Sequence, residues 1–253
     1  RDRQGCTALI RAAGSGHDAV LEELLNRHAD VAARAQTGTT ALAAALLSGQ
    51  YPLVDRLIAQ GAAVDQRLAN DATTLMVAAA CGRQAGVDLL LSAGADIAAR
   101  DASGNTALHA AAGFAFGSAD GDAVRQLLLT LIAAGSDVDA VNGAGLQPIH
   151  IACGAASAVR ANSAGIDAAL DILLSRIGTA AAVDERGCAA LHYAAAHGQL
   201  AAVRPLLARG AEPAGRDHGG WTAENYAAHY GYTEVAQALR PPPLTAALPL
   251  RPG

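Results

Sequence analysis

The sequence predicts an all-α repeat solenoid, a stack of short helix-turn-helix units. Three observations predict this fold class. A Gly-x-Thr-x-Leu motif recurs along the 253 residues at a nearly constant spacing, and each copy is followed by two short apolar segments with a glycine between them. Alanine dominates the apolar residues whereas aromatic residues make up only 3% of the chain, a composition that suits closely packed helices. A chain of this length is more readily stabilised by a stack of mutually sealed units than by one compact core.

The recurring motif fixes the length of the unit. Its first residue is the anchor, and the anchors are Gly5, Gly38, Asp71, Gly104, Gly145, Gly187 and Gly220. The steps between them are 33, 33, 33, 41, 42 and 33 residues, and four equal steps are hard to reach by chance. We therefore expect seven units that start near residues 2, 35, 68, 101, 142, 184 and 217 and together form a domain of residues 2–240. Residues 241–253 begin with three prolines, which cannot continue a helix, and are expected to form an extended tail.

Each unit contains the signals for two helices. The threonine of the motif precedes an alanine-rich segment, such as residues 107–112, which is expected to be the first helix. After a glycine, a second helix carries two adjacent aliphatic residues that should face the same seam in every unit. These pairs are Leu24 with Leu25, Leu57 with Ile58, Leu90 with Leu91, Leu131 with Ile132, Leu173 with Leu174 and Leu206 with Leu207.

A glycine-containing turn closes the second helix. Gly61, Gly94 and Gly135 each follow the last apolar residues of their helix, where glycine adopts the left-handed conformation without steric cost. The segment that follows is expected to extend away from the helices as a hairpin-like finger between successive helix pairs.

These motifs resemble the ankyrin repeat family, whose unit runs approximately D-x-x-G-x-T-P-L-H-x-A-A-x-x-G-H and ends in L-L-x-x-G-A-D-V-N. Residues 101–111, with the sequence DASGNTALHAA, are the best single copy. The resemblance extends from residue 2 to about residue 240, and it implies a protein-binding domain that has no catalytic activity and no cofactor. The last unit has Glu224 in place of the core leucine and ends with Leu239 and Arg240, which is typical of a polar terminal cap.

Charge and composition argue against several classes of partner. The net charge is −5 at pH 7 and the pI is near 5.9, which provides no electrostatic attraction to nucleic acid or to an anionic membrane. No segment approaches the roughly 20 apolar residues that span a bilayer, so no direct membrane insertion is expected. All 18 basic residues are arginine, which indicates the base composition of a GC-rich bacterial genome. A protein partner is therefore expected.

The four cysteines are scattered along the chain, at Cys6, Cys81, Cys153 and Cys188. None forms a C-x-x-C pair, and reduced, mostly buried thiols favour a reducing compartment such as the cytoplasm, with a secreted effector as the alternative. Cys153 and Cys188 lie in units adjacent to one another, as do His150 and His192, but Cys153 occupies an alanine core position. Because zinc sites are built from short local spacings, no metal site is predicted.

A row of histidines is the most obvious catalytic candidate. His109, His150 and His192 occupy one equivalent position in units four, five and six, but aligned residues of a repeat usually serve the fold. The resemblance implies that each imidazole hydrogen-bonds its own turn and the neighbouring unit. The chain also lacks the G-x-S-x-G, H-E-x-x-H and P-loop motifs, so no catalytic residue and no enzymatic activity is predicted.

A second row consists of arginines at one equivalent finger position. The residues are Arg34, Arg67, Arg100 and Arg216. Stacked units would align their guanidinium groups along one edge, where they could make bidentate contacts with carboxylates of a partner. The alternative is that these charges are only solvated. They are candidate partner-binding residues.

The first helix of each unit projects one variable side chain toward the concave face, directly after the histidine position. These residues are Arg11, Ala44, Val77, Ala110, Ile151, Tyr193 and Tyr226. Tyrosine is common at binding hot spots because it offers a large contact area at low entropic cost, and the C-terminal half of this face is aromatic. Its candidate partner-binding residues are Ile151, Tyr193, His197, Tyr226 and Tyr230. The alternative is that these rings only cover the end of the stack.

The two longer steps indicate insertions in units four and five. They fall between the helices of each unit, around residues 113–121 and 154–165, and are expected to form two loops that lie side by side. The first contains both phenylalanines of the chain, Phe114 and Phe116. These side chains either bind a partner or fold inward to cover the helix pair, and both are candidate binding residues.

The sequence thus favours a non-enzymatic, monomeric module that binds a partner protein through its concave face, finger tips and inserted loops. The alternative is the recognition arm of a larger bacterial enzyme or secreted effector, because Arg1 already lies in the opening turn of a unit and an active domain could precede it. The reading frame upstream of Arg1 would distinguish the two.

Overall fold

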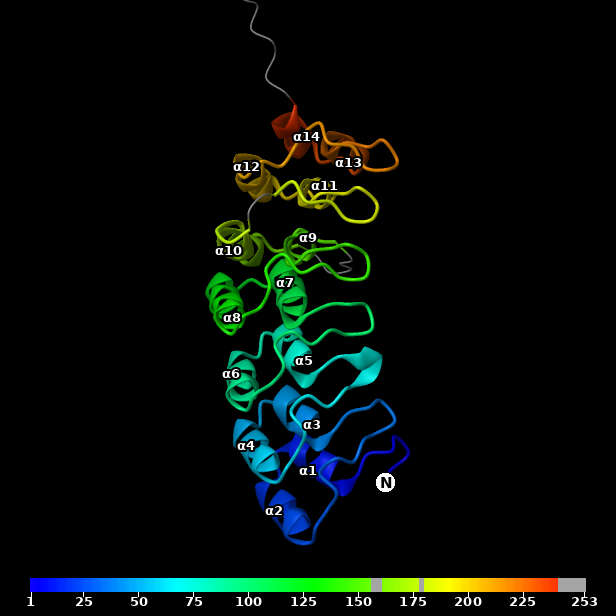
Figure 1. Cartoon of the computed structure of the whole chain (residues 1–253), viewed down its shortest axis with the longest axis vertical. Coiled ribbons are helices and arrows are strands. Elements are labelled where there is room, and N and C mark those ends of the chain that lie inside the picture. The colour runs from blue at the N-terminus through cyan, green and yellow to red at the C-terminus, as the bar shows by residue number, and fades with distance from the viewer. Residues whose placement is uncertain (156–160, 178–179, 241–253) are drawn as a thin grey trace, which may run out of the picture.

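The computed structural model describes residues 1–155, 161–177 and 180–240. Figure 1 shows that these residues stack along one long axis, with two rows of helices and a series of loops that project from the side opposite the second row. Apart from one isolated bridge between Val183 and Ala189, the described ranges contain helices, turns and loops. The predicted all-α repeat fold is therefore confirmed. The predicted tail, residues 241–253, and residues 156–160 of the second insertion lie outside the described residues.

The helices form pairs in chain order. The first row consists of α1 (Ala8–Ser15), α3 (Ala41–Leu47), α5 (Thr74–Ala80), α7 (Ala107–Gly117), α9 (Pro148–Ala152), α11 (Ala190–Ala196) and α13 (Ala223–His229). The second row consists of α2 (Asp18–Asn26), α4 (Tyr51–Ala59), α6 (Gln84–Ser92), α8 (Gly121–Ala133), α10 (Ser163–Leu174), α12 (Leu200–Ala208) and α14 (Thr233–Leu239). A 3-10 helix, η1 (Ala69–Asp71), lies in one finger. Within the described ranges, no helix has the length and apolar character that crossing a membrane requires.

The motif threonines begin the first helices because their hydroxyl groups cap free N–H groups of the first turn. Thr7 Oγ1 accepts a hydrogen bond from the Ile10 N–H at 3.3 Å. Thr40 Oγ1 accepts one from the Ala43 N–H at 3.2 Å. Gly16 ends α1 in the left-handed conformation, with φ 70°. The helix ends therefore lie where the motif residues place them.

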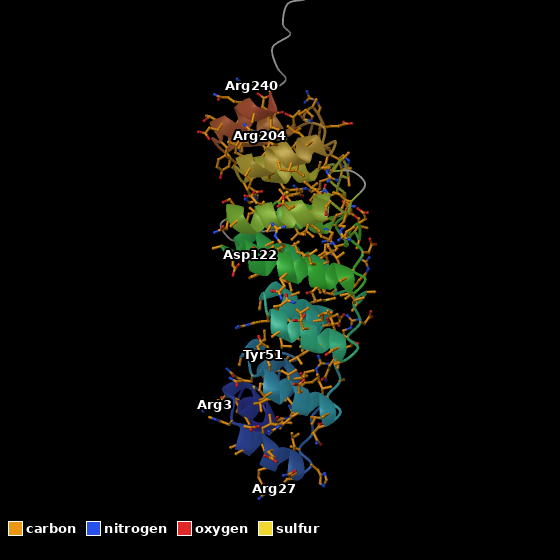
Figure 2. All side chains as sticks on the ribbon, turned by 90° about the vertical axis from the view of Figure 1, so that its left-hand side faces the viewer. Arg3, Arg27, Tyr51, Asp122, Arg204 and Arg240 are labelled. Carbon is orange, nitrogen blue, oxygen red and sulfur yellow. The ribbon has the colours of Figure 1, made fainter. Side chains whose placement is uncertain are left out.

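The predicted aliphatic seam forms the core between the two rows. The fully buried first members of the pairs are Leu57, Leu90, Leu131, Leu173 and Leu206. Complete burial of one such side chain contributes about 1.5–3 kcal/mol. The outward face of the second row is polar in comparison, and Figure 2 shows Asp122 and Arg204 on it.

The fingers are hairpin-like, as the sequence predicts, and they are joined to one another. In unit four the Asp101 N–H donates to the Asn105 carbonyl at 3.0 Å, which closes the tip. The Gly143 N–H of the next finger donates to the Ser103 carbonyl at 2.8 Å. Backbone hydrogen bonds therefore fix the spacing of the fingers as well as that of the helices.

The insertion of unit four is helical rather than a loop, which corrects the sequence prediction. Its residues extend α7 as far as Gly117, and α8 begins at Gly121, so that only residues 118–120 connect the two helices. The helix continues because Phe116 follows Ala112 by four residues and both side chains lie on the buried face. The additional apolar surface stabilises a longer helix pair.

The two insertions lie side by side, as predicted, in the described part of the second one. The Asn162 N–H donates to the Phe116 carbonyl at 2.8 Å, and the Gly165 N–H donates to the Ser118 carbonyl at 3.2 Å. A Cβ atom on Gly165 would lie 2.1 Å from the carbonyl oxygen of Ala115. Only glycine therefore fits where the start of α10 meets the end of α7.

In the last unit, the two polar residues that replace apolar residues of the repeat, Glu224 and Arg240, form an ion pair with each other. Arg240 Nε donates to Glu224 Oε1 at 2.8 Å. Because both side chains are partly exposed, this ion pair contributes at most about 1 kcal/mol. It nevertheless holds the end of α14 against α13 with polar groups instead of an aliphatic contact.

The close helix contact gives a first prediction. Gly165→Ala should lower the free energy of unfolding by about 1–3 kcal/mol, because the new methyl group forces α10 away from α7. Gly113→Ala is the matched control, since the nearest atom to its Cβ would be Ile151 Cγ2 at 3.7 Å and the position is helical. The control should be neutral or raise stability by about 0.5–1 kcal/mol. Urea unfolding followed by circular dichroism measures both, and equal effects of the two changes would contradict the packing argument.

Candidate functional site

The histidine row joins consecutive units. His109 Nδ1 accepts from the Thr106 N–H at 3.2 Å, and its Nε2 lies 2.9 Å from the Leu146 carbonyl oxygen of the next unit. With Nδ1 as the acceptor, the Nε2–H is the donor. The next two histidines repeat the pattern: His150 with Gln147 and Ala182, and His192 with Ala189 and Gly215. The structural role implied by the resemblance is therefore confirmed.

These imidazoles are buried connectors. Burial lowers the pKa of His109 and of His150 below 6.5, against the smaller opposing effect of their carbonyl partners, so both are neutral at pH 7. Burial also raises the pKa of the Cys153 thiol to about 12. In the part of the chain that the structure describes, no group of three or more His, Cys, Asp or Glu side chains is arranged to hold a metal ion.

The arginine row also joins consecutive units, a role that the sequence analysis did not foresee. Arg34 donates to the Arg67 carbonyl. Arg67 donates in turn to the Arg100 carbonyl at 2.6 Å and to the Asp71 carbonyl at 2.8 Å. Arg216 donates to the Gly220 carbonyl of its own finger at 2.6 Å. The guanidinium groups therefore bind backbone carbonyls of this chain.

The two phenylalanine rings pack against other residues of this chain. Phe116 is 0% exposed, and its ring makes an edge contact with the His197 ring at a centroid distance of 5.1 Å. Phe114 is half-buried and covers Gly82 of the preceding unit, where a Cβ atom would lie 2.3 Å from the ring. Of the two alternatives for Phe116, the structure therefore shows the inward one, because the extension of α7 directs this side chain into the core.

The variable side chains lie between the fingers and the first-row helices, on the surface that we call the finger–helix face. In its middle a cavity of about 620 Å³ is lined by finger residues of units four and five and by the first helices. Ile151 of α9 lines the cavity together with Asp101 and Asn142. His197 lies toward the C-terminal end of the stack, where its Nε2 is 3.1 Å from the Gly154 carbonyl oxygen.

Two tyrosines of this face are fixed to the fingers. The Tyr193 hydroxyl donates to Asp184 Oδ2 at 2.6 Å, and the Tyr226 hydroxyl donates to Asp217 Oδ2 at 2.7 Å. Burial and the adjacent carboxylate both raise the pKa of each tyrosine. These rings, with His197 and Tyr230, border a cavity of about 230 Å³. The tyrosine rings are held in one orientation before any partner arrives.

Four rings gather at the last unit, and we call them the C-terminal aromatic cluster: Trp221, Tyr226, His229 and Tyr230. The Trp221 ring lies 5.3 Å from Tyr226 and 5.1 Å from His229, and the His229 ring lies 4.9 Å from Tyr230, measured between centroids. Trp221 is 38% exposed and Tyr230 is 56% exposed. With Asp217 and Gly219 they line a hollow of about 290 Å³.

The structure brings together the predicted residues Tyr226 and Tyr230, and it adds Trp221, which sequence reasoning missed. A signal was present, because this residue is the only tryptophan of the chain and directly follows the anchor Gly220. The distant candidates do not join this cluster: Ile151 lines the central cavity, and Phe114 lies over Gly82.

The arginine row gives a second prediction. Arg67→Ala should lower the free energy of unfolding by about 1–3 kcal/mol, because it removes charge-assisted hydrogen bonds to two carbonyls, one in its own finger and one in the next finger. Arg216→Ala removes the hydrogen bond to the Gly220 carbonyl within a single finger and should lower stability less. Urea unfolding midpoints compare the two variants, and a larger loss for the Arg216 variant would refute the inter-unit role.

The histidine row gives a third prediction, for pH dependence. The unfolded chain binds protons on His109 and His150 near pH 6.5, whereas the folded chain requires a lower pH, so stability should fall as the pH decreases from 7.5 to 5.5. His109→Asn does not titrate, and Asn225 already accepts the equivalent N–H bond from Thr222 at 3.0 Å. This variant should be less stable at pH 7.5 but lose less stability on acidification. Unfolding curves across this pH range test it, and an unchanged slope would disprove the assignment.

Comparison with known protein families agrees with this geometry. Residues 1–68 and 43–129 match the family model described as ankyrin repeats (3 copies), and residues 182–240 match the one described as ankyrin repeats (many copies). No curated protein matches the chain at the significance required. The first model covers half of the chain, and its matches include His109 and the arginines Arg34, Arg67 and Arg100. The chain therefore belongs to the ankyrin repeat family, whose repeats are generally protein–protein interaction modules.

Proposed function

We propose that this domain binds a partner protein without catalysis, through the finger–helix face, and that the strongest contact lies at the C-terminal aromatic cluster. The observation that carries the proposal is the exposure of Trp221 and Tyr230 beside a hollow on that face. Tryptophan and tyrosine dominate binding hot spots because they combine a large apolar area with a polar group.

The rigidity of the surface supports the same proposal. The hydroxyl groups of Tyr193 and Tyr226 are anchored by carboxylates, so little side-chain entropy remains to be lost when a partner binds. The neighbouring cavity of about 230 Å³ has room for one side chain of a partner. The central cavity around Ile151 is a second contact region on the same face.

The outer face of the second row has fewer features suited to binding a partner than the finger–helix face. Its exposed large apolar side chains include Val20 on α2 and Leu129 on α8, which lie three units apart and form no ring cluster. Scattered single apolar residues are normal on a protein surface. This face therefore supplies the control position for a binding experiment.

A displayed random-peptide library selected on the immobilised domain gives the fourth prediction. Enriched peptides should bind about 10-fold or more weakly to Tyr230→Ala, because the change removes a large exposed ring from the cluster. Leu129→Ala on α8 is the control and should bind them as the unaltered domain does. Fluorescence anisotropy with labelled peptides measures the affinities. Peptides that are sensitive to Leu129 but not to Tyr230 would show that the proposed face is incorrect.

A further inference from the structure

We infer that the C-terminal aromatic cluster together with Asp217 is a subsite for one positively charged side chain, an arginine or a lysine, of the bound protein. The inference rests on the proposed function and specifies the chemistry of the partner at this point of the finger–helix face.

The rings offer the first component of a cation site. Neighbouring rings are inclined by 60°, 73° and 80°, so their faces and edges surround the hollow from several directions. A guanidinium or ammonium group within about 6 Å of an aromatic face is attracted by the negative charge of the ring face. Among the described residues, these four rings contact one another and the His192 ring, and no arginine of this chain stacks on them.

Asp217 supplies the second component, a fixed negative charge. Its Oδ1 accepts from the Trp221 N–H at 2.8 Å, and its Oδ2 accepts from the Tyr226 hydroxyl at 2.7 Å. Burial by itself would raise the pKa of this carboxyl group, but these donors outweigh burial and lower the pKa below 3.8. The group is therefore ionised at neutral pH. The Gly219 N–H and the Cys188 thiol, whose Sγ is 3.9 Å from Oδ2, also donate to this carboxylate, so a partner's cation is attracted by the charge and not by an unfilled acceptor position.

The charges of the neighbouring groups do not neutralise Asp217. Glu224, a nearby acid on α13, is paired with Arg240. The guanidinium of Arg216 donates to the Gly220 carbonyl on its own finger. Arg186 borders the adjacent cavity of about 230 Å³, whereas the lining of the 290 Å³ hollow contains no basic residue other than His229. No ion pair within the described ranges includes Asp217.

The uncompensated charge of Asp217 determines which side chain of a partner the hollow favours. An apolar or acidic side chain placed over the hollow would remove water from an ionised carboxylate without compensating its charge, which is unfavourable. A basic side chain compensates the charge and at the same time contacts the ring faces. The chemistry of the hollow therefore favours a cation.

The single tryptophan allows a direct test, because Trp221 lines the hollow and its fluorescence reports occupancy. The full chain is titrated with capped Gly-X-Gly peptides in which X is arginine, lysine, citrulline or glutamate. The arginine and lysine peptides should change the fluorescence in a saturable manner. The citrulline peptide, which has the shape of arginine without its charge, should bind about threefold to tenfold more weakly.

Asp217→Asn removes the negative charge of this side chain and should preserve the fold of the finger. In unit five the equivalent residue is already an asparagine, and Asn142 Oδ1 accepts the N–H groups of Ala144 and Leu146 at 2.9 and 3.0 Å. This variant should bind the arginine peptide only as well as the citrulline peptide. Asp122→Asn, the same change on the exposed outward face of the second row, is the matched control and should leave arginine binding unchanged.

Equal binding of the arginine, citrulline and glutamate peptides, or full arginine affinity in Asp217→Asn, overturns the inference. If none of the short peptides changes the fluorescence while library peptides still bind in a Tyr230-dependent manner, the cation subsite is refuted and the proposed function stands. If library peptides bind independently of Tyr230 but the arginine peptide still binds through Asp217, the proposed face fails and the cation subsite stands.

Discussion

The fold depends on hydrogen bonds that leave one unit and end on a backbone carbonyl of the next. The Nε2–H of His109 reaches Leu146, the guanidinium of Arg67 reaches Arg100, and the Gly143 N–H reaches Ser103. The His109 bond lies at the start of the first helix, and the Arg67 and Gly143 bonds lie along the finger. Together with the buried leucine seam they fix both the spacing and the orientation of neighbouring units, because a repeat unit cannot bury its apolar side alone.

This constraint explains how the irregular units are tolerated. The extra residues of unit four do not separate units four and five, since they extend α7 and α8 along their own axes. The added length is then matched by α10, whose Gly165 permits contact with the carbonyl of Ala115. Phe116 fills the space that the longer helices create and reaches the His197 ring two units away. The insertion therefore enlarges the hydrophobic core and does not form an independent loop.

The same framework positions the candidate site. An aspartate at the start of a unit accepts two finger N–H groups through one oxygen, and its other oxygen remains available to a side chain nine residues later. In unit one that side chain is Arg11, at 2.6 Å from Asp2, and in units six and seven it is a tyrosine. A structural device of the fold thus becomes the support for aromatic rings on the finger–helix face.

The sequence by itself determined the repeat and the start of the threonine-capped first helices, and its resemblance to a known family implied the role of the histidines, because these depend on local motifs that recur at a fixed spacing. It also identified Tyr226 and Tyr230 as surface candidates. Only the tertiary structure decided that Phe116 is buried, that three of the four arginines bind the next finger, and that Trp221 completes the aromatic cluster. These outcomes depend on the distance between units and on the direction of each side chain, which are set by packing between segments distant in sequence and not by a local pattern.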